Sequence, residues 1–362
     1  MNKNKINSLQ LGSLILCPIL SASLGIGLYN AIQIAKVDSY IGIFISSILG
    51  IIPLLLIIYI SKFEEDKNII EKINILYGKY IGTFINFIIV SILFVIGITI
   101  LFGICNFIVT QFLANTPIMY VGIMFGIVCV YSVSKGIETI SRTQFIFTFI
   151  ITIIFITLAA SLYPEFDKSN LKPFLEYGIN SPLKVGILNL FTNIIPIFII
   201  LIIPKGNICD KEKYTKFVII FYIISILFIL LISIFNIGVL GQYLASFYQY
   251  PEYILLKKVN LFGFIDRIEN ILSIGWILST YATLTLIIYY INNFIKKNDK
   301  SKLSPLIITS LIILTSLFIF KNNTTFNMYI TNIYPYIISI LFVIMIIICI
   351  TIIIKKKINY NN

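Results

Sequence analysis

The chain has 362 residues, a net charge of +12, 59% apolar and 12% charged residues, and a mean hydropathy of +1.00. These values exclude a soluble globular domain, because apolar runs of about 18 to 25 residues recur along the chain and each can cross a bilayer. The positive charge does not indicate a nucleic-acid partner, since the cations lie at the edges of the apolar runs. The sequence predicts an all-α integral membrane protein with a single transmembrane domain over residues 1–362.

The residue inventory also argues against catalysis. The chain contains no histidine, which excludes histidine metal ligands and histidine proton relays. Its five cysteines have no metal-ligand spacing, and there is no P-loop, no nucleophile–histidine–aspartate set and no pair of carboxylates on an exposed domain. We therefore expect no enzymatic activity, no bound metal and no cofactor.

About ten membrane spans follow one another along the chain. The connections between them alternate in charge, and one side of the membrane receives roughly 19 of the 27 Lys and Arg residues. This asymmetry predicts that both termini are cytoplasmic. The expected spans are 9–35, 39–61, 80–112, 117–134, 141–162, 183–203, 217–240, 262–292, 303–320 and 329–354.

The first span is interrupted near its centre by the sequence Ser21-Ala22-Ser23-Leu24-Gly25-Ile26-Gly27. Five of these seven residues are small and two are glycine, which weakens a helix at a depth where lipid demands continuous hydrogen bonding. Two interpretations are open from this stretch alone. It is either a broken helix that lines a ligand site, or a close helix contact, because Ser21/Gly25 and Ser23/Gly27 both have small-xxx-small spacing.

Ten spans divide into two sets of five, and because five is odd the second set has to insert upside down. The sequence therefore predicts inverted repeats over about 9–162 and 183–354, joined by an outer loop at 163–182. The sixth span carries a matching interruption, in which Pro196 leaves the carbonyl of Thr192 without its helical partner and Asn193 adds a polar side chain. A simple proline kink is the alternative.

The paired interruptions favour a small-molecule site between helices 1 and 6. The candidate ligand-binding residues are Ser21, Ala22, Ser23, Gly25, Ile26, Gly27, Thr192, Asn193 and Pro196.

Three connections between the spans have features of their own. The segment Lys67–Tyr80 is predicted to form a short surface helix with Asp66 as its N-cap. Tyr163–Lys184 is a polar outer loop. The outer segment Gln242–Lys258 has aromatic residues suited to an interfacial belt, namely Tyr243, Phe247, Tyr248, Tyr250 and Tyr253.

Ionisable residues at membrane depth are candidates for function. Asp266, Arg267 and Glu269 cluster near the outer end of the eighth span, where Asp266 and Glu269 share a helix face. They form either an ion pair that locks helices or the outer vestibule, or a direct ligand contact. Glu138 and Arg142, four residues apart at the inner end of the fifth span, predict a salt bridge worth a few tenths of a kcal/mol.

Four stretches together resemble one known family. They are the interrupted first span; Gly136-Ile137-Glu138-Thr139-Ile140-Ser141-Arg142; Asn170-Leu171-Lys172-Pro173 followed by Gly178-Ile179-Asn180-Ser181-Pro182-Leu183; and Tyr250-Pro251-Glu252 followed by Phe264-Ile265-Asp266-Arg267-Ile268-Glu269 and Trp276. In this order, the chain resembles the B subunit of spore germinant receptors, the GerAB-type endospore germination permeases, over essentially its full length.

The resemblance implies the fold of the amino acid–polyamine–organocation superfamily (LeuT/APC-type), with helices 1–5 and 6–10 as inverted repeats. It also implies an A-type subunit and a C-type lipoprotein subunit as partners, the spore inner membrane as location, and the sensing of small nutrients, often amino acids. The sixth-span interruption departs from the wider superfamily, because Asn193 and Pro196 stand there without a glycine.

We therefore expect a nutrient-sensing subunit that binds a small zwitterion and signals to its partners. Its carboxylate would meet N–H groups near Gly25–Gly27, and its ammonium would meet carbonyls around Ser21–Ser23 and Thr192–Asn193. The alternatives are a secondary amino-acid transporter, a gated ion or water channel, and a purely structural scaffold. Acidic residues are expected deep in a span only around Asp266 and Glu269, which weakens proton coupling and leaves Na⁺ coupling open.

Overall fold

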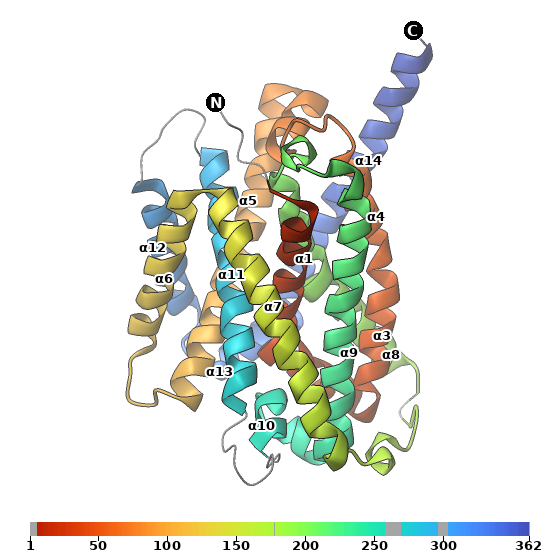
Figure 1. The fold of residues 1–362 in the computed structure, drawn as a ribbon, viewed down its shortest axis with the longest axis vertical. Helices are drawn as coiled ribbons and strands as arrows, with labels where there is room; N and C mark the ends of the chain where they lie inside the picture. Colours follow the sequence, from red (N-terminus) through yellow and green to blue (C-terminus); the bar gives the residue numbers. More distant parts are fainter. Residues whose placement is uncertain (1–5, 177, 258–268, 296–302, 362) are drawn as a thin grey trace.

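The computed structural model describes residues 6–176, 178–257, 269–295 and 303–361. Over these residues the chain forms one helical bundle (Figure 1). Its α-helices are α1 (Ser8–Ala22), α2 (Leu28–Ala35), α3 (Ser39–Leu49), α4 (Ile51–Ser61), α5 (Ile69–Gln111), α6 (Ile118–Lys135), α7 (Ile137–Leu162), α8 (Asn180–Asn189), α9 (Tyr214–Phe247), α10 (Pro251–Lys257), α11 (Glu269–Ile295), α12 (Leu303–Ile319), α13 (Asn323–Asn332) and α14 (Tyr334–Asn361).

The described helices account for the ten predicted membrane passes. Eight helical stretches are long and apolar enough to span a bilayer. The first of them, Ser8–Ser61, has 54 residues and turns back at Lys36–Asp38, so it makes two passes; Figure 1 shows α3 and α4 returning along the bundle. The shorter apolar helix α12 supplies the remaining pass.

Both ends of the described chain lie at the same end of the bundle (Figure 1), as an even number of passes requires. We refer to this end as the inner end, following the charge asymmetry of the sequence, and to the opposite end as the outer end.

Helix α5 begins earlier than the predicted third span and includes the predicted surface helix. Asn68 is its N-cap, since the Asn68 side chain accepts the Glu71 N–H at 2.9 Å and the Glu71 side chain accepts the Asn68 N–H at 3.0 Å. The prediction of Asp66 as the cap is therefore wrong, because the reciprocal capping box fixes the start two residues later. A kink at Gly78, with φ of 78°, separates the surface turns from the membrane pass.

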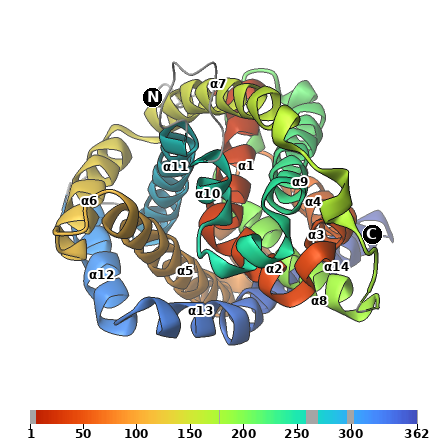
Figure 2. The same ribbon diagram turned by 90° about the horizontal axis from the view of Figure 1, so that it is seen from below.

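Helix α1 lies in the middle of the bundle and packs against α7, α9 and α11 (Figure 2). Its side chains from Leu11 to Leu16 are almost fully buried. The contact with α9 is close, because a Cβ atom added to Gly12 would overlap the ring of Phe221. Small residues allow this kind of approach between membrane helices.

Replacing Gly12 with alanine should therefore destabilise the bundle by about 1–3 kcal/mol, the usual cost of overpacking a buried contact. Gly122→Ala is a matched control, because Gly122 is also buried in a span but an added Cβ would lie 3.6 Å from Ile313, an ordinary contact. The measurement is the thermal unfolding midpoint of each purified variant. Equal midpoints for both variants would contradict this account of the α1–α9 contact.

Polar contacts tie three segments together at the inner end. The Ser8 N–H donates to Asp210 Oδ1 at 2.7 Å, next to a β-bridge between Ile6 and Ile208. Lys205 forms a salt bridge of 2.5 Å with Glu65. The start of the first span, the connection after the second and the connection after the sixth are thereby joined.

The salt bridge between Lys205 and Glu65 at the inner end should weaken in acid. The hydrogen bond from Lys205 holds the pKa of Glu65 below its usual range. Because the folded-state pKa is depressed, the stabilisation is complete above the unfolded-state value of about 4.3 and is lost as the pH falls through the folded value. The unfolding midpoint of wild-type protein should drop over this acid range. Glu65→Gln should show a smaller drop, and an identical drop would exclude Glu65 as a contributor.

The outer segment 242–258 differs from the predicted interfacial belt. Tyr243 and Phe247 are exposed, as a belt requires, but Tyr250 and Tyr253 are each only 5% exposed. Their rings pack against Phe107 of α5, with centroid distances of 4.9 and 5.6 Å. The belt prediction is therefore wrong for these two tyrosines, because α10 turns into the bundle and buries them.

Candidate ligand-binding site between two broken helices

The first span is broken as the sequence predicted. Leu24 has an extended ψ of 141° and Gly25 has φ of 76°, inside a wide turn over Ser23–Gly27 that separates α1 from α2. The Leu28 N–H closes this turn on the Ser23 carbonyl, five residues back. A positive φ is accessible to glycine at low cost, which explains why Gly25 stands at the break.

The sixth span is also broken. Helix α8 ends at Asn189, a wide turn covers Leu190–Ile194, and a 3₁₀-helix follows over Ile195–Ile202 with Pro196 in its first turn. Pro196 cannot donate a backbone hydrogen bond, so the regular α-helix cannot continue through it. The change of helix type at the same place in both spans confirms the predicted pair of broken helices.

The two breaks touch each other. A Cβ atom added to Gly27 would lie 2.9 Å from Nδ2 of Asn193 and 3.0 Å from the Ala22 carbonyl oxygen. The stretch therefore contains both a helix break, which Gly25 permits, and a close helix contact, which Gly27 permits.

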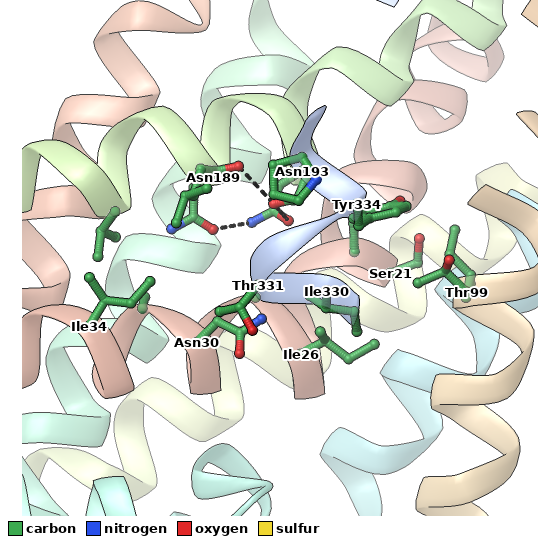
Figure 3. A pocket seen from close by; sticks show the side chains of 18 residues that line it. Ser21, Ile26, Asn30, Ile34, Thr99, Asn189, Asn193, Ile330, Thr331 and Tyr334 are labelled. Atoms are coloured by element: carbon green, nitrogen blue, oxygen red, sulfur yellow. Dashed lines mark hydrogen bonds between the residues drawn. The ribbon is translucent and has the colours of Figure 1, made fainter. Parts of the chain in front are cut away.

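A cavity lies beside these breaks (Figure 3). The space open to the centre of a water molecule is about 40 Å³, several times what one buried water needs. Its walls come from α1, α2, α5, α8, the sixth-span turn and the α13–α14 junction. The polar residues in these walls are Ser21, Asn30, Thr99, Asn189, Thr192, Asn193, Thr331 and Tyr334.

Part of this polar lining is already arranged by internal hydrogen bonds. Asn193 Nδ2 donates to Asn189 Oδ1 at 2.6 Å, and Thr192 Oγ1 donates to Asn193 Oδ1 at 2.9 Å. Figure 3 shows the Asn189 and Asn193 side chains projecting towards the helix that carries Asn30. Asn30 and Tyr334 form no side-chain hydrogen bond with any residue that the structure describes, so their polar groups are available to a ligand.

The lining carries no charged side chain among the described residues. A ligand with a net charge would therefore lose its hydration without gaining a counter-charge, which is costly in a membrane interior. The lining suits a solute without net charge whose polar groups can be met by amides, hydroxyls and backbone.

The cavity includes six of the nine candidate residues: Ser21, Ala22, Ile26, Gly27, Thr192 and Asn193. Ser23, Gly25 and Pro196 shape the breaks but do not line it. The Ser23 hydroxyl donates to the Ile19 carbonyl at 2.7 Å instead.

Two backbone groups at the first break are used by the protein itself. The Gly25 N–H donates to Oε1 of Glu252, and the Ser21 carbonyl accepts the indole N–H of Trp276 at 3.3 Å. These are groups that the sequence assigned to the carboxylate and the ammonium of a ligand. In this conformation, side chains from α10 and α11 occupy them.

Sequence reasoning missed several residues of the site. Asn30, Asn189 and Thr99 are polar residues within apolar spans, and their polarity at that depth is the feature that could have identified them from the sequence. Tyr334 and Glu252 had no such signal, because tyrosine is common in membrane helices and Glu252 lies in a connection between spans.

The predicted charged groups lie apart from the cavity or outside the described residues. Arg142 and Glu138 form the expected salt bridge of 2.5 Å, and the Arg142 side chain is 66% exposed. Asp266 and Arg267 lie outside the described residues, as does the side chain of Glu269, so their roles stay predictions.

Two solved transporter structures share this fold. One is a Na⁺-coupled sialic acid symporter in a substrate-bound outward-open state, with a TM-score of 0.59 and 13% identity, covering 96% of this chain and 78% of that one. The other is Mhp1, a nucleobase-cation-symport-1 family transporter in a closed conformation with bromovinylhydantoin bound, with a TM-score of 0.61 and 12% identity, covering 94% and 77%. The chain therefore has the LeuT-type transporter fold, as predicted.

The sequence pattern of the family described as "Spore germination protein" matches residues 5–327, and the chain belongs to this family. It is 24% identical to Spore germination protein XB of Bacillus anthracis over 276 residues, which is 76% of each chain. It is also 24% identical to Spore germination protein KB of Bacillus subtilis (strain 168) over 301 residues, covering 80% of this chain and 77% of that one. Family and fold together make it a membrane subunit that senses germinants or transports solutes.

Proposed function

We propose that the chain is the nutrient-sensing B-type subunit of a spore germination receptor and that it binds a small solute of zero net charge, an amino acid above all, in the cavity between helices 1 and 6. The observation that carries this proposal is the cavity itself. It lies beside two broken helices, and its described lining is rich in hydrogen-bonding groups but free of charged side chains.

An amino-acid zwitterion fits such a lining because its two charges cancel overall, while each one can be met by oriented dipoles. The side-chain amides of Asn30, Asn189 and Asn193 can donate to a carboxylate, and their carbonyl oxygens, with the Tyr334 hydroxyl, can accept from an ammonium group. We infer that these side chains take the roles that the sequence had assigned to backbone at Ser21–Ser23 and Gly25.

The signalling step follows from how small the cavity is. A space of about 40 Å³ for water centres holds a few waters, so an amino acid requires the walls to separate. A ligand that binds an expanded arrangement better than the contracted one shifts the population towards it. We propose that A-type and C-type subunits in the spore inner membrane detect this shift, and that both termini face the cytoplasm.

The direct test is binding of labelled amino acids to the purified chain in lipid vesicles. Neutral amino acids should bind, and lysine and glutamate should bind at least tenfold more weakly, because an added net charge would be buried without a partner. Equal binding of charged and neutral amino acids would exclude this site.

Secondary transport is the alternative with a specific observation in its favour. Ser21 Oγ lies 2.9 Å from Thr283 Oγ1 at the first break, and the buried Thr280 hydroxyl has no hydrogen-bond partner among the described residues. Hydroxyl oxygens of this kind suit Na⁺. Uptake of labelled amino acid into vesicles that contain the chain alone, driven by a Na⁺ gradient, would favour transport. Binding without uptake would favour sensing.

A further inference from the structure

Glu252 brings an acidic side chain into the bundle where the sequence gave no sign of one. It belongs to the seven-residue helix α10, which lies over α1 between α9 and α11 (Figure 2). The residue is only 3% exposed. One carboxyl oxygen, Oε1, accepts the N–H of Gly25 at the first-span break, so α10 is attached directly to the broken helix.

The other carboxyl oxygen, Oε2, is buried without a hydrogen-bond partner. Glu252 also lines a small void together with Leu24, Phe107, Ser273 and Trp276. The void offers about 10 Å³ to water centres, which is near the minimum for one water molecule. This carboxyl oxygen therefore has a place for a proton, and the void beside it can hold the water molecule that would exchange it.

No basic residue neutralises this carboxyl group within the part of the chain that the structure describes. On α10 itself, Lys257 lies over the ring of Tyr253, with its Nζ 4.7 Å from the centroid, and forms no ion pair with Glu252. The neighbouring Tyr250 hydroxyl accepts a hydrogen bond of 2.7 Å from Asn106 of α5.

Among the described side chains, the elements packed against α10 add no charge either. Helix α5 presents Phe107 and Asn106, α11 presents Ser273 and Trp276, and the break presents Leu24 and backbone. The outer half of α9, from Phe228 to Phe247, contains no charged residue. Among the described side chains, the titratable neighbours of Glu252 are thus Tyr250 and Tyr253, and an ordinary tyrosine is neutral at physiological pH.

We propose that Glu252 is a proton-binding site that couples proton occupancy to the conformation of the helix 1 break. Glu252 is a buried carboxyl group that no described side chain neutralises; its ionised form is therefore costly, and a proton removes that cost. Burial accordingly raises the pKa of Glu252 to about 7. The site therefore changes charge near neutral pH.

The coupling follows from the bond to Gly25. An ionised carboxylate accepts the Gly25 N–H as a charge-assisted hydrogen bond, which is about twice as strong as a neutral one. Protonation of Oε2 weakens that bond and loosens the attachment of α10 to the break. Low pH therefore favours a conformation in which α10 is detached from the helix 1 break. The two protonation states of Glu252 should differ about fivefold to tenfold in their preference for the conformation in which α10 is attached.

The chain carries its own probe for this titration. Trp276 is its single tryptophan, and its ring lines the same void as Glu252. The chain also has no histidine, so few other groups titrate near neutral pH. The experiment follows Trp276 fluorescence of the full-length protein in lipid vesicles from about pH 5 to about pH 9, where ordinary carboxyl, tyrosine and lysine groups keep their charge.

Wild-type protein should show one sigmoidal change with a midpoint near neutral pH. Glu252→Gln should abolish it, and Glu252→Asp should keep a titration with a displaced midpoint. Should Glu252→Gln fail to fold, the wild-type titration and the Glu252→Asp displacement still decide the question. A flat wild-type curve, or an unchanged curve in Glu252→Gln, would overturn the proposal. Because no ligand is present, the outcome does not depend on the proposed function.

Discussion

Gly25→Leu should abolish ligand binding and the germination response while leaving the amount of receptor in the membrane unchanged. The Gly25 backbone has φ of 76°, and an added Cβ would overlap the ring of Trp276, so the break cannot keep its shape. The loss should exceed 100-fold in the nutrient concentration that gives half-maximal germination. The measurement is germination of spores that carry the variant with its partner subunits, at matched receptor levels.

Gly78→Leu provides the matched control for backbone strain. Gly78 has nearly the same φ, 78°, but a Cβ added there would meet nothing within 4 Å. It should cost about 1 kcal/mol of stability and keep the response. A second variant, Gly25→Ala with Trp276→Ala, removes the ring that would be overlapped and should recover part of the structure. Spores with Gly25→Leu that respond normally would show that the helix 1 break is not part of the site.

Asn193→Leu should weaken ligand binding by about 10-fold to 100-fold, the range expected when a buried polar partner is lost. The leucine would remove the 2.6 Å hydrogen bond to Asn189 and leave that amide without its donor in the cavity wall. It would also take one amide away from the ligand. The measurement is the dissociation constant of the labelled amino acid, with the thermal unfolding midpoint recorded in parallel.

Asn236→Leu is the control for burying a leucine in place of an asparagine. Asn236 is fully buried in α9, and neither of its amide atoms has a hydrogen-bond partner among the described residues. Its replacement should leave ligand affinity unchanged within twofold and should not lower the unfolding midpoint. If both variants lost affinity equally, the effect would be one of helix packing and not of the cavity.

The large features of this protein follow from its sequence because they depend on local composition. Apolar runs of bilayer length define the passes, and unmatched polar backbone is intolerable in lipid, so a stretch such as Ser21–Gly27 can break a helix only inside the protein. Pro196 breaks the sixth span by removing a donor, wherever its neighbours lie. For this reason the matching breaks, the ten passes and the Glu138–Arg142 pair could be predicted from the sequence. The predicted repeat boundaries and the ligand contacts stay predictions.

Only the tertiary structure decided which groups meet at the breaks. Asn189 and Tyr334 are about 150 residues apart in the sequence yet line one cavity, and Glu252, from a connection between spans, caps the Gly25 N–H. Tyr250 and Tyr253 look like interfacial residues but are buried against Phe107. A helix break creates free donors and acceptors, and these are satisfied by whichever distant group the packing brings within hydrogen-bonding distance. The sequence therefore predicts where a helix breaks, and the packing of the bundle determines which groups form hydrogen bonds at the break.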